Sequence, residues 1–231
     1  MKTRIGTLGG ISAAYTSAYC DRMIEGFHER LHVTYYPEIV IFSLDFQRFT
    51  DLEDGKYRGG DRDGYVEEIM SGIAALEGAG VEIILMAANS PHAVFDEIDA
   101  RATVPMLSIV QVMADAAKES GLGGLLLLGI KFTMQARFYQ EACARRGIDV
   151  TVPTDGDQDR INAIIFDELA RGIIKEESKN ELLGIIDGYE VDGVMLGCTE
   201  LPLLLDQGHT SVTLLDTMEW HVQAALDLAL G

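Results

Sequence analysis

The amino-acid sequence predicts an α/β fold with two similar lobes, each a mostly parallel sheet flanked by helices. Short, nearly continuous apolar segments recur along the 231 residues, as expected of strands that are covered on both faces. Between them, apolar residues return every three or four positions, which is the periodicity of helices packed on a sheet. The pattern also repeats, because Leu8-Gly9 and Leu128-Gly129 each end an apolar segment and lead into a helical one.

Strands and helices are expected to alternate along the chain. Strands are predicted from the apolar runs at residues 4–8, 38–43, 81–87, 124–128, 149–152, 191–196 and 212–215. Helices are predicted from the spacing of apolar positions at residues 13–29, 64–78, 109–120, 134–146, 159–172, 175–189 and 218–230. Residues 55–63 are rich in Gly and charged side chains, which is typical of a surface loop.

The internal repeat places a lobe boundary near residue 100. The first lobe is predicted to comprise residues 1–100 together with 210–231, so that the last strand and helix return to it. The second lobe is predicted to comprise residues 101–209. Ala88-Asn89-Ser90 then corresponds to Cys198-Thr199-Glu200, so that one lobe carries a thiol where the other carries a methyl group.

The chain is strongly acidic, with 37 Asp and Glu against 18 Lys and Arg and a formal net charge of −19. Basic side chains that contact phosphates dominate nucleic-acid affinity, so nucleic acid is not an expected partner. No apolar stretch approaches the roughly 20 residues that span a bilayer, so no membrane partner is expected. A small acidic ligand would need local donors, such as a helix N-terminus or one Arg, to offset the charge.

Three cysteines, Cys20, Cys143 and Cys198, are scattered along the chain. Their spacing fits neither a disulfide framework nor a zinc site, so a reducing cytoplasm is the expected location. The histidines have no ligand-like spacing and no HExxH motif is present, so no metal site is expected.

The carboxyl ends of parallel strands are where open α/β sheets bind their ligands. We therefore expect the corners that follow the strands to converge on a cleft between the two lobes. At the first corner, Gly9-Gly10 would let backbone N–H groups approach a ligand carboxylate, and Ser12 precedes a helix. The alternative is that the Gly pair only forms a tight turn and that Ser12 only caps the helix.

Cys198 is the strongest candidate for catalysis, because it ends an apolar strand and opens a turn. At a helix N-terminus, the positive end of the helix dipole would favour the thiolate, which can act as a base or nucleophile. The alternative is an inert core cysteine. Cys20 and Cys143 lie within amphipathic helices and are interpreted as core residues.

Three further residues are expected to reach the cleft. His92 follows the Asn89-Ser90 corner and could donate a hydrogen bond or shuttle a proton, and the alternative is a histidine with a structural partner at a helix start. Arg48 and Lys131 are the best cation candidates for a ligand carboxylate, and the alternative for each is a solvated side chain.

Four segments, in their order and spacing, resemble the aspartate/glutamate racemase family of cofactor-independent amino-acid racemases. They are Gly9-Gly10-x-Ser12, Met86 to His92, Gly197-Cys198-Thr199-Glu200 and Leu215-Asp216-Thr217. The resemblance covers nearly the whole chain, and the Gly-Cys-Thr-Glu segment is its most specific part. It implies two Rossmann-like lobes with the active site between them, a homodimer, and a reaction that uses neither pyridoxal phosphate nor a metal.

The resemblance also implies a two-base mechanism, in which one cysteine removes the Cα proton and a second returns a proton on the opposite face. The family's usual segment in the first lobe is Cys-Asn-Thr followed shortly by His. Here Asn89, Ser90 and His92 match or nearly match it, but Ala88 stands at the position of the cysteine. Alanine cannot transfer a proton, so one face lacks its acid/base group unless water, His92 or a neighbouring side chain substitutes.

The resemblance therefore predicts an amino-acid racemase-like isomerase that acts on an acidic amino acid such as aspartate or glutamate. Cys198 is the expected acid/base, and the substrate carboxylate or amino group is expected to contact Asn89, Ser90, Thr133 and Thr199. Two alternatives stay open. A single cysteine also suits a one-base lyase, such as a decarboxylase of a small carboxylic acid, and a silenced protein would bind an acidic amino acid without proton exchange.

Overall fold

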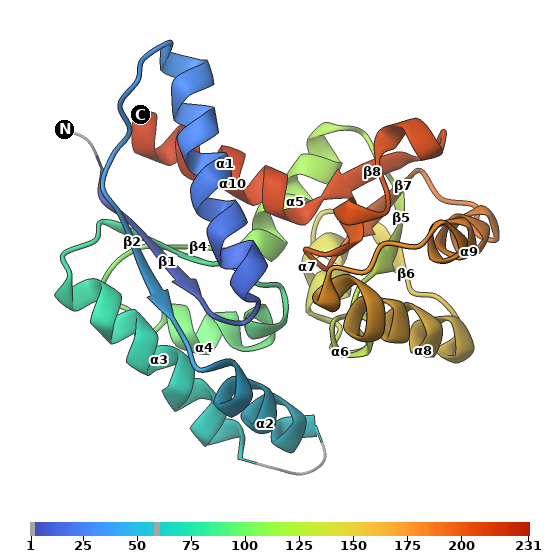
Figure 1. The fold of residues 1–231 in the computed structure, drawn as a ribbon, viewed down its shortest axis with the longest axis horizontal. Coiled ribbons are helices and arrows are strands. Elements are labelled where there is room, and N and C mark those ends of the chain that lie inside the picture. Colours follow the sequence, from blue (N-terminus) through green and yellow to red (C-terminus); the bar gives the residue numbers. More distant parts are fainter. Residues whose placement is uncertain (1–2, 58–60) are drawn as a thin grey trace. The chain divides into compact units, whose positions relative to one another are not determined.

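The computed structural model describes residues 3–57 and 61–231, and the chain divides into two compact units (Figure 1). Unit 1 comprises Met1–Ser108 and His221–Gly231, and unit 2 comprises Ile109–Trp220. Each unit contains one four-stranded parallel sheet with helices beside it, which confirms the predicted α/β fold class.

The sheet of unit 1 has the strand order β2-β1-β3-β4. Its strands pair in parallel and are β1 (Ile5–Gly9), β2 (Ile39–Ser43), β3 (Ile83–Met86) and β4 (Met106–Leu107). The helical elements are α1 (Ala13–Leu31), α2 (Phe46–Tyr57), α3 (Arg62–Gly78), the 3-10 helix η1 (Ser90–Val94), α4 (Phe95–Asp99) and the later part of α10 (Thr217–Leu230). Strands β1 and β3 are buried along their whole length, which explains their apolar sequences.

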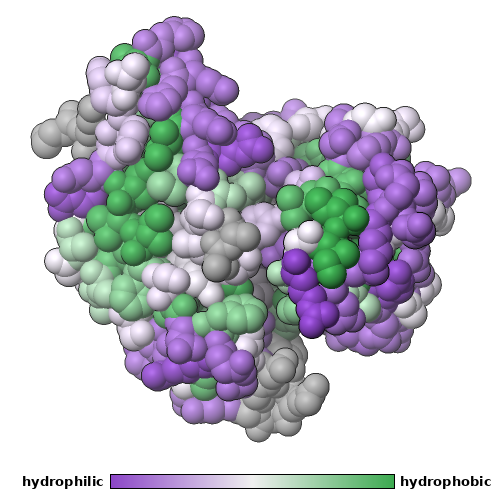
Figure 2. Space-filling view, in the orientation of Figure 1, coloured by the Kyte–Doolittle hydropathy of each residue, from purple (hydrophilic) through white to green (hydrophobic). Residues whose placement is uncertain are grey.

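Strand β2 forms one edge of this sheet and carries apolar side chains toward solvent. Ile41 in β2 is 40% exposed, and Figure 2 shows hydrophobic surface over this strand. Open strand edges with apolar side chains are common where a second chain binds.

The sheet of unit 2 has the order β6-β5-β7-β8 and is also parallel. Its strands are β5 (Gly124–Leu128), β6 (Asp149–Thr151), β7 (Gly193–Leu196) and β8 (Thr213–Asp216). Its helices are α5 (Ile109–Glu119), α6 (Lys131–Gln135), α7 (Phe138–Ala144), α8 (Asp155–Ala163) and α9 (Glu176–Asp187). Short helical segments lie at Ile164–Glu168, Leu169–Arg171, Leu201–Leu203 and Gln207–His209.

The predicted internal repeat is present in the strand order, because β1 to β4 and β5 to β8 follow the same sequence of neighbours. The backbone register extends this match to the corners that follow β3 and β7. The Ala87 N–H donates to the Leu8 carbonyl oxygen at 2.8 Å, and the Gly197 N–H donates to the Leu128 carbonyl oxygen at 2.7 Å. Ala88 in unit 1 therefore occupies the register position that Cys198 occupies in unit 2.

The predicted lobe boundaries need two corrections. Strand β8 does not return to the first lobe, because it pairs with β7, where Val194 lies opposite Leu214. Of the predicted 210–231 segment, only His221–Gly231 belongs to unit 1. Residues 101–108 also belong to unit 1 rather than to the second lobe, because β4 pairs with β3, where Ile84 lies opposite Met106.

Some helix predictions are also wrong. The helix predicted at 134–146 is two helices, because Arg137 between them has a φ of 63° in the left-handed region. Helices α2 and α4 were not predicted. Of the loop predicted at 55–63, residues 55–57 end α2 and Asp61 caps α3 by accepting the Gly64 N–H, whereas residues 58–60 lie outside the described residues.

Candidate active site

The corner after β3 holds four of the predicted site residues in one buried turn. Ala88, Asn89, Ser90 and His92 are each at most 8% exposed, and η1 begins at Ser90 with Pro91 in its first turn. His92 Nδ1 lies 3.0 Å from the Ala88 carbonyl oxygen. Because a carbonyl can only accept, Nδ1 carries the proton and donates it to Ala88. The His92 side chain therefore ties the turn back onto the end of β3.

His92 is a neutral imidazole at physiological pH. Burial, and to a smaller extent the neighbouring His221, lower the pKa of His92 to about 3. Its ring stacks on Phe95 at a centroid distance of 5.4 Å. These contacts give His92 a structural partner, which was the alternative interpretation of its sequence position. Its one proton is bonded to the Ala88 carbonyl oxygen, and a base this weak takes up no second proton near neutral pH.

His221 belongs to the same buried cluster and was not predicted. Its Nε2–H donates to the Leu107 carbonyl oxygen at 3.0 Å, so its Nδ1 accepts from the Tyr19 hydroxyl at 3.1 Å. Burial lowers the pKa of His221 to about 4. The His92 and His221 rings meet edge to face at 6.1 Å. Tyr19 is far from His221 in the sequence, and no spacing rule brings them together.

The Gly9-Gly10 corner is explained by backbone geometry. Gly10 has a φ of 88°, and a Cβ there would collide with the backbone of Leu44. The Gly10 N–H donates to Thr16 Oγ1 at 2.9 Å, and that hydroxyl donates to the Ser12 carbonyl oxygen at 2.9 Å. The Gly10 N–H, which was expected to approach a ligand carboxylate, is therefore bonded within the chain. The Ser12 side chain makes no capping hydrogen bond.

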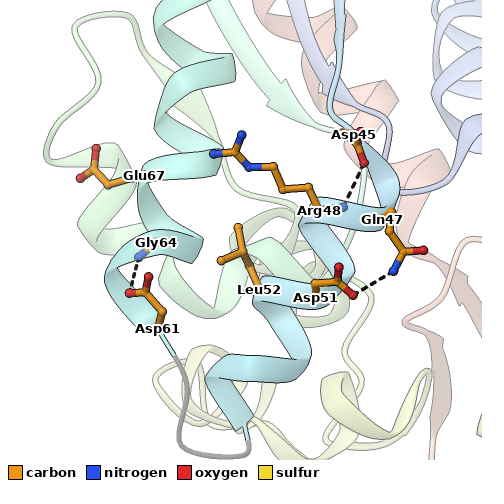
Figure 3. Close-up of a pocket in the computed structure, with 8 residues that line it drawn as sticks. All are labelled: Asp45, Gln47, Arg48, Asp51, Leu52, Asp61, Gly64 and Glu67. Carbon is orange, nitrogen blue, oxygen red and sulfur yellow. Dashed lines mark hydrogen bonds between the residues drawn. The ribbon is translucent and has the colours of Figure 1, made fainter.

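Arg48 lies in α2 and reaches toward α3 (Figure 3). Its Nε lies 2.8 Å from Glu68 Oε2, and Glu68 is buried. The depression beside it is lined by Asp45, Gln47, Arg48, Asp51, Leu52, Asp61, Gly64 and Glu67. The Arg48 side chain is 69% exposed, which agrees with the alternative of a solvated side chain, and its charge is paired with the buried Glu68 carboxylate of α3.

The corner after β7 holds the thiol. Cys198 is 8% exposed, and its Sγ donates to Glu200 Oε2 at 2.9 Å. The Thr199 hydroxyl donates to the same oxygen at 3.2 Å, and Glu200 itself is 7% exposed. Sequence reasoning identified Cys198 and Thr199 but not the direct bond to Glu200, because two residues of spacing do not fix where a side chain turns.

Cys198 is a thiol rather than a thiolate in this state. Burial, followed by the negative charge of Glu200, raises its pKa well above the usual value, and the backbone N–H groups of Glu200 and Thr199 lower it only partly. The expected helix dipole is missing, because the helical segment that follows is the three-residue 3-10 helix Leu201–Leu203. The prediction of a thiolate favoured by a helix is therefore wrong.

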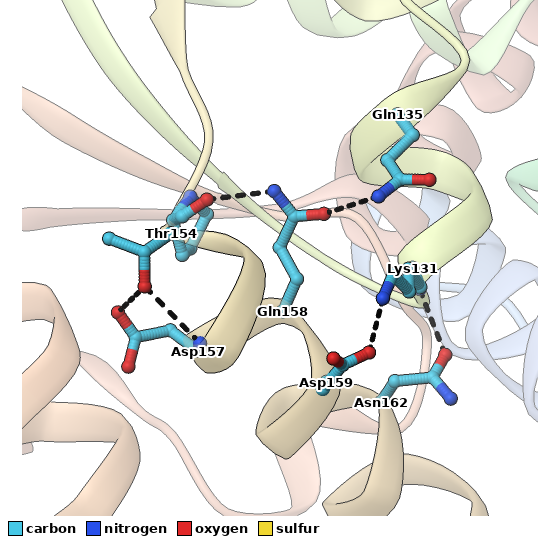
Figure 4. A network of polar contacts seen from close by, with 8 residues as sticks. Lys131, Gln135, Thr154, Asp157, Gln158, Asp159 and Asn162 are labelled. Carbon is cyan, nitrogen blue, oxygen red and sulfur yellow. Dashed lines mark hydrogen bonds and ion pairs between the residues drawn. The ribbon is translucent and has the colours of Figure 1, made fainter.

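Lys131 and Thr133 lie in α6, which follows the Gly129 corner. Lys131 Nζ pairs with Asp159, and its backbone N–H donates to Asn162 Oδ1 at 2.9 Å (Figure 4). Gln158 of α8 accepts a bond from Gln135 at 3.1 Å in the same network. These bonds join α6 to α8, so Lys131 is occupied within unit 2.

Thr133 stands closer to the thiol corner. A Cβ built on Gly197 would lie 3.5 Å from Thr133 Cγ2, an ordinary van der Waals distance, so the Thr133 side chain lies next to Gly197. Thr133 is fully buried, and its Oγ1 has no hydrogen-bond partner among the described residues. A buried hydroxyl without a partner costs about 1–3 kcal/mol. Thr133 thus offers a buried hydroxyl next to Gly197, the residue that precedes Cys198 in the chain.

Residues 3–57 and 61–231 contain no group of three or more His, Cys, Asp or Glu side chains arranged to hold a metal ion. No helix in these residues combines the length and the apolar character needed to cross a membrane.

Comparison with known proteins gives a consistent result. The family model for Asp/Glu/Hydantoin racemase matches residues 8–225. The chain is 26% identical over 228 residues to the broad specificity amino-acid racemase RacX of Bacillus subtilis (strain 168), covering 92% of each protein. The crystal structure of an aspartate racemase homologue from Pyrococcus horikoshii OT3 superposes with a TM-score of 0.86 at 37% identity, covering 100% of both chains.

A Picrophilus torridus aspartate racemase has the same fold, with a TM-score of 0.77 at 21% identity over 98% of this chain and 94% of that one. The match to the family model spans both units, including the β3 corner with Ala88 and the β7 corner with Cys198. The chain therefore belongs to the Asp/Glu/hydantoin racemase family.

Proposed function

We propose that this protein is a pyridoxal-phosphate-independent, racemase-like isomerase that transfers the Cα proton of an acidic amino acid such as aspartate or glutamate, with Cys198 as the acid/base. The observation that carries the proposal is the Cys198 corner of a racemase-family chain, where a buried thiol ends β7 and bonds to the Glu200 carboxylate at 2.9 Å. A buried thiol can exchange a proton with a carbon acid away from competing water.

The substrate contacts in this proposal come from both catalytic corners. Thr199 and Thr133 serve the substrate near Cys198, and Asn89 and Ser90 serve it from the corner of Ala88. A role in substrate binding is less well supported for the other predicted contacts, which are Gly10, Ser12, Arg48 and Lys131. Three of them already have partners within the chain: Gly10 is bonded to Thr16, Arg48 to Glu68 and Lys131 to Asp159. The proposal requires that both corners act on one substrate molecule.

Ala88 limits what this chemistry can achieve. Racemisation needs a proton removed on one face of Cα and returned on the other. Cys198 supplies one face, whereas Ala88 supplies no acid/base group on the other. His92 does not replace it in this proposal, because its Nδ1–H is bonded to Ala88 and its pKa is about 3. We therefore propose fast exchange with retention and slow inversion, with water as the second proton donor.

Ala88 also favours a second candidate, a one-base lyase that decarboxylates a small malonate-like acid. Such a reaction needs one acid to protonate a carbanion on one face, which Cys198 alone can do. A protein that binds an acidic amino acid without any proton transfer is the third candidate.

Incubation in D2O with D- and L-amino acids and small dicarboxylates distinguishes the three. Proton NMR would follow Cα deuteration, and chiral chromatography would follow configuration. Deuteration supports proton transfer at Cα of an amino acid. Retention of configuration would indicate that one face of Cα exchanges its proton, and inversion would indicate that both faces do. Loss of CO2 from a dicarboxylate supports the lyase. Ligand binding without exchange or decarboxylation would leave only the binding protein.

We also propose a cytoplasmic homodimer. The apolar edge strand β2, with Ile41 40% exposed, is compatible with a second copy. Light scattering after size-exclusion chromatography should give about twice the mass of one chain, and a monomeric mass would contradict this part of the proposal.

A further inference from the structure

Glu200 is a buried carboxylate that accepts hydrogen bonds from the Cys198 thiol and the neighbouring Thr199 hydroxyl. Its Oε2 accepts from Cys198 Sγ at 2.9 Å and from the Thr199 hydroxyl at 3.2 Å. Glu200 is only 7% exposed and forms no ion pair with a described Lys, Arg or His of unit 2. Burying a carboxylate without a cation is costly, so this side chain has no evident role in stabilising the fold.

The other charged groups near the corner are occupied elsewhere. Asp216 at the end of β8 accepts the Met218 and Glu219 N–H groups at the start of α10, and Lys131 of α6 pairs with Asp159. Glu200 is the charged side chain that influences the pKa of Cys198, which it raises. The thiol and this carboxylate therefore form an isolated acidic pair.

We propose that Cys198 and Glu200 share one proton, so that Glu200 is a positioning residue that holds the thiol proton while Cys198 works as a base. This inference rests on the proposed function and deepens it. In the resting pair the proton is on Sγ and Glu200 is a carboxylate. On activation the S–H bond breaks, an O–H bond forms at Oε2, and the electron pair remains on sulfur.

The thiolate then forms a new S–H bond with the substrate Cα proton, and the electron pair of the broken C–H bond remains on the substrate as a carbanion. While the carbanion persists, the protons on Sγ and Oε2 exchange with solvent, so that in D2O a deuteron can return from Sγ to Cα and label the substrate. Return of the remaining hydron from Oε2 to Sγ regenerates the resting pair. Without Glu200 the thiolate forms only by losing its proton to solvent, which a buried site hinders.

The substitution Glu200→Gln separates two effects of the carboxylate on Cys198, its negative charge and its ability to take up the thiol proton. An amide carries no charge, so the thiolate becomes easier to form, but an amide cannot take up the proton. We expect iodoacetamide to alkylate Cys198 at a lower pH midpoint and several-fold faster near neutral pH, measured on the Cys198 peptide by mass spectrometry. We expect Cα deuteration to fall roughly 100-fold in the same variant. A merely structural residue would not move the two rates in opposite directions.

Two variants serve as controls. Glu200→Asp keeps the carboxylate but shortens it by one methylene, so both rates should lie between those of the wild type and Glu200→Gln, which also tests the pair if the Gln variant does not fold. Glu190→Gln removes one exposed carboxylate of unit 2 and should change neither rate.

An unchanged or higher alkylation midpoint in folded Glu200→Gln or Glu200→Asp would overturn the shared proton. An unchanged deuteration rate would overturn it as well. The alkylation midpoint needs no substrate, so a lower midpoint in an enzyme whose wild type exchanges no tested compound would support the pair while contradicting the proposed function.

Discussion

Ala88 and Cys198 occupy the same register position in two sheets of identical strand order. The residues before them make matching bonds, Ala87 to Leu8 at 2.8 Å and Gly197 to Leu128 at 2.7 Å. One corner thus carries a buried thiol and the other a methyl group, in a chain that belongs to a racemase family. This difference determines which proton transfers we expect.

Cys198→Ala should abolish Cα exchange, because it removes the acid/base group while changing little volume. We expect a loss of roughly 100-fold to 10,000-fold in the deuteration rate, measured by NMR on the substrate found in the D2O screen. Cys20→Ala is the matched control, because Cys20 lies within helix α1 of unit 1, whereas Cys198 belongs to unit 2, and its rate should equal that of the wild type. Equal loss in both variants would argue against a specific role for Cys198.

Acid should weaken unit 1 through its two buried histidines. His92 and His221 have folded pKa values of about 3 and 4, whereas an unfolded His titrates near 6.5. Below pH 6.5 the unfolded chain therefore binds protons that the folded chain does not. The contribution of these two histidines to the free energy of unfolding is fully present above about pH 6.5. It decreases as the pH falls, by roughly 1.4 kcal/mol per pH unit and per histidine.

Urea unfolding at several pH values between about 5 and 8 would measure this dependence. In His221→Gln the free energy of unfolding should fall less steeply with decreasing pH than in the wild type. His32→Asn is the control, because His32 is exposed and its left-handed φ of 51° suits Asn. A slope in His221→Gln as steep as in the wild type would show that other groups cause the acid sensitivity.

Gly10→Ala should destabilise the protein by about 1–3 kcal/mol or more, because the φ of 88° and the nearby Leu44 backbone both oppose a Cβ. Gly184→Ala is a matched control within α9, where a Cβ meets nothing within 4 Å, and it should stabilise by about 0.5–1 kcal/mol. The urea midpoints of both variants measure the contrast. Similar midpoints for the two would contradict the steric account of the first corner.

The sequence was informative where local pattern determines structure. The run at residues 124–128 is β5, and the repeat of corners appears as two sheets of one order. The sheet that β8 joins could not be predicted, because the apolar pattern of an edge strand does not specify which sheet it pairs with. Arg137 shows a similar limit, since its left-handed φ is imposed by the surrounding fold rather than by its own preference.

The candidate site divides in the same way. Motif positions pointed to Cys198, Asn89, Ser90 and His92, and these residues do lie at buried strand ends. Partners were not predictable, because the Tyr19 to His221 bond joins distant segments and the Cys198 to Glu200 bond depends on rotamers. The thiolate prediction failed since it assumed a helix where only a three-residue 3-10 helix follows.

The most direct test of the account is the rate of Cα inversion in Ala88→Cys relative to that in the wild type, followed by chiral chromatography. Ala100→Cys is the matched control, because Ala100 is exposed at the end of α4. If the two corners act on opposite faces of one substrate, inversion should rise at least about 10-fold in Ala88→Cys and stay at the wild-type rate in Ala100→Cys. No rise in a folded Ala88→Cys variant that still exchanges the Cα proton with retention would contradict the pairing of these corners.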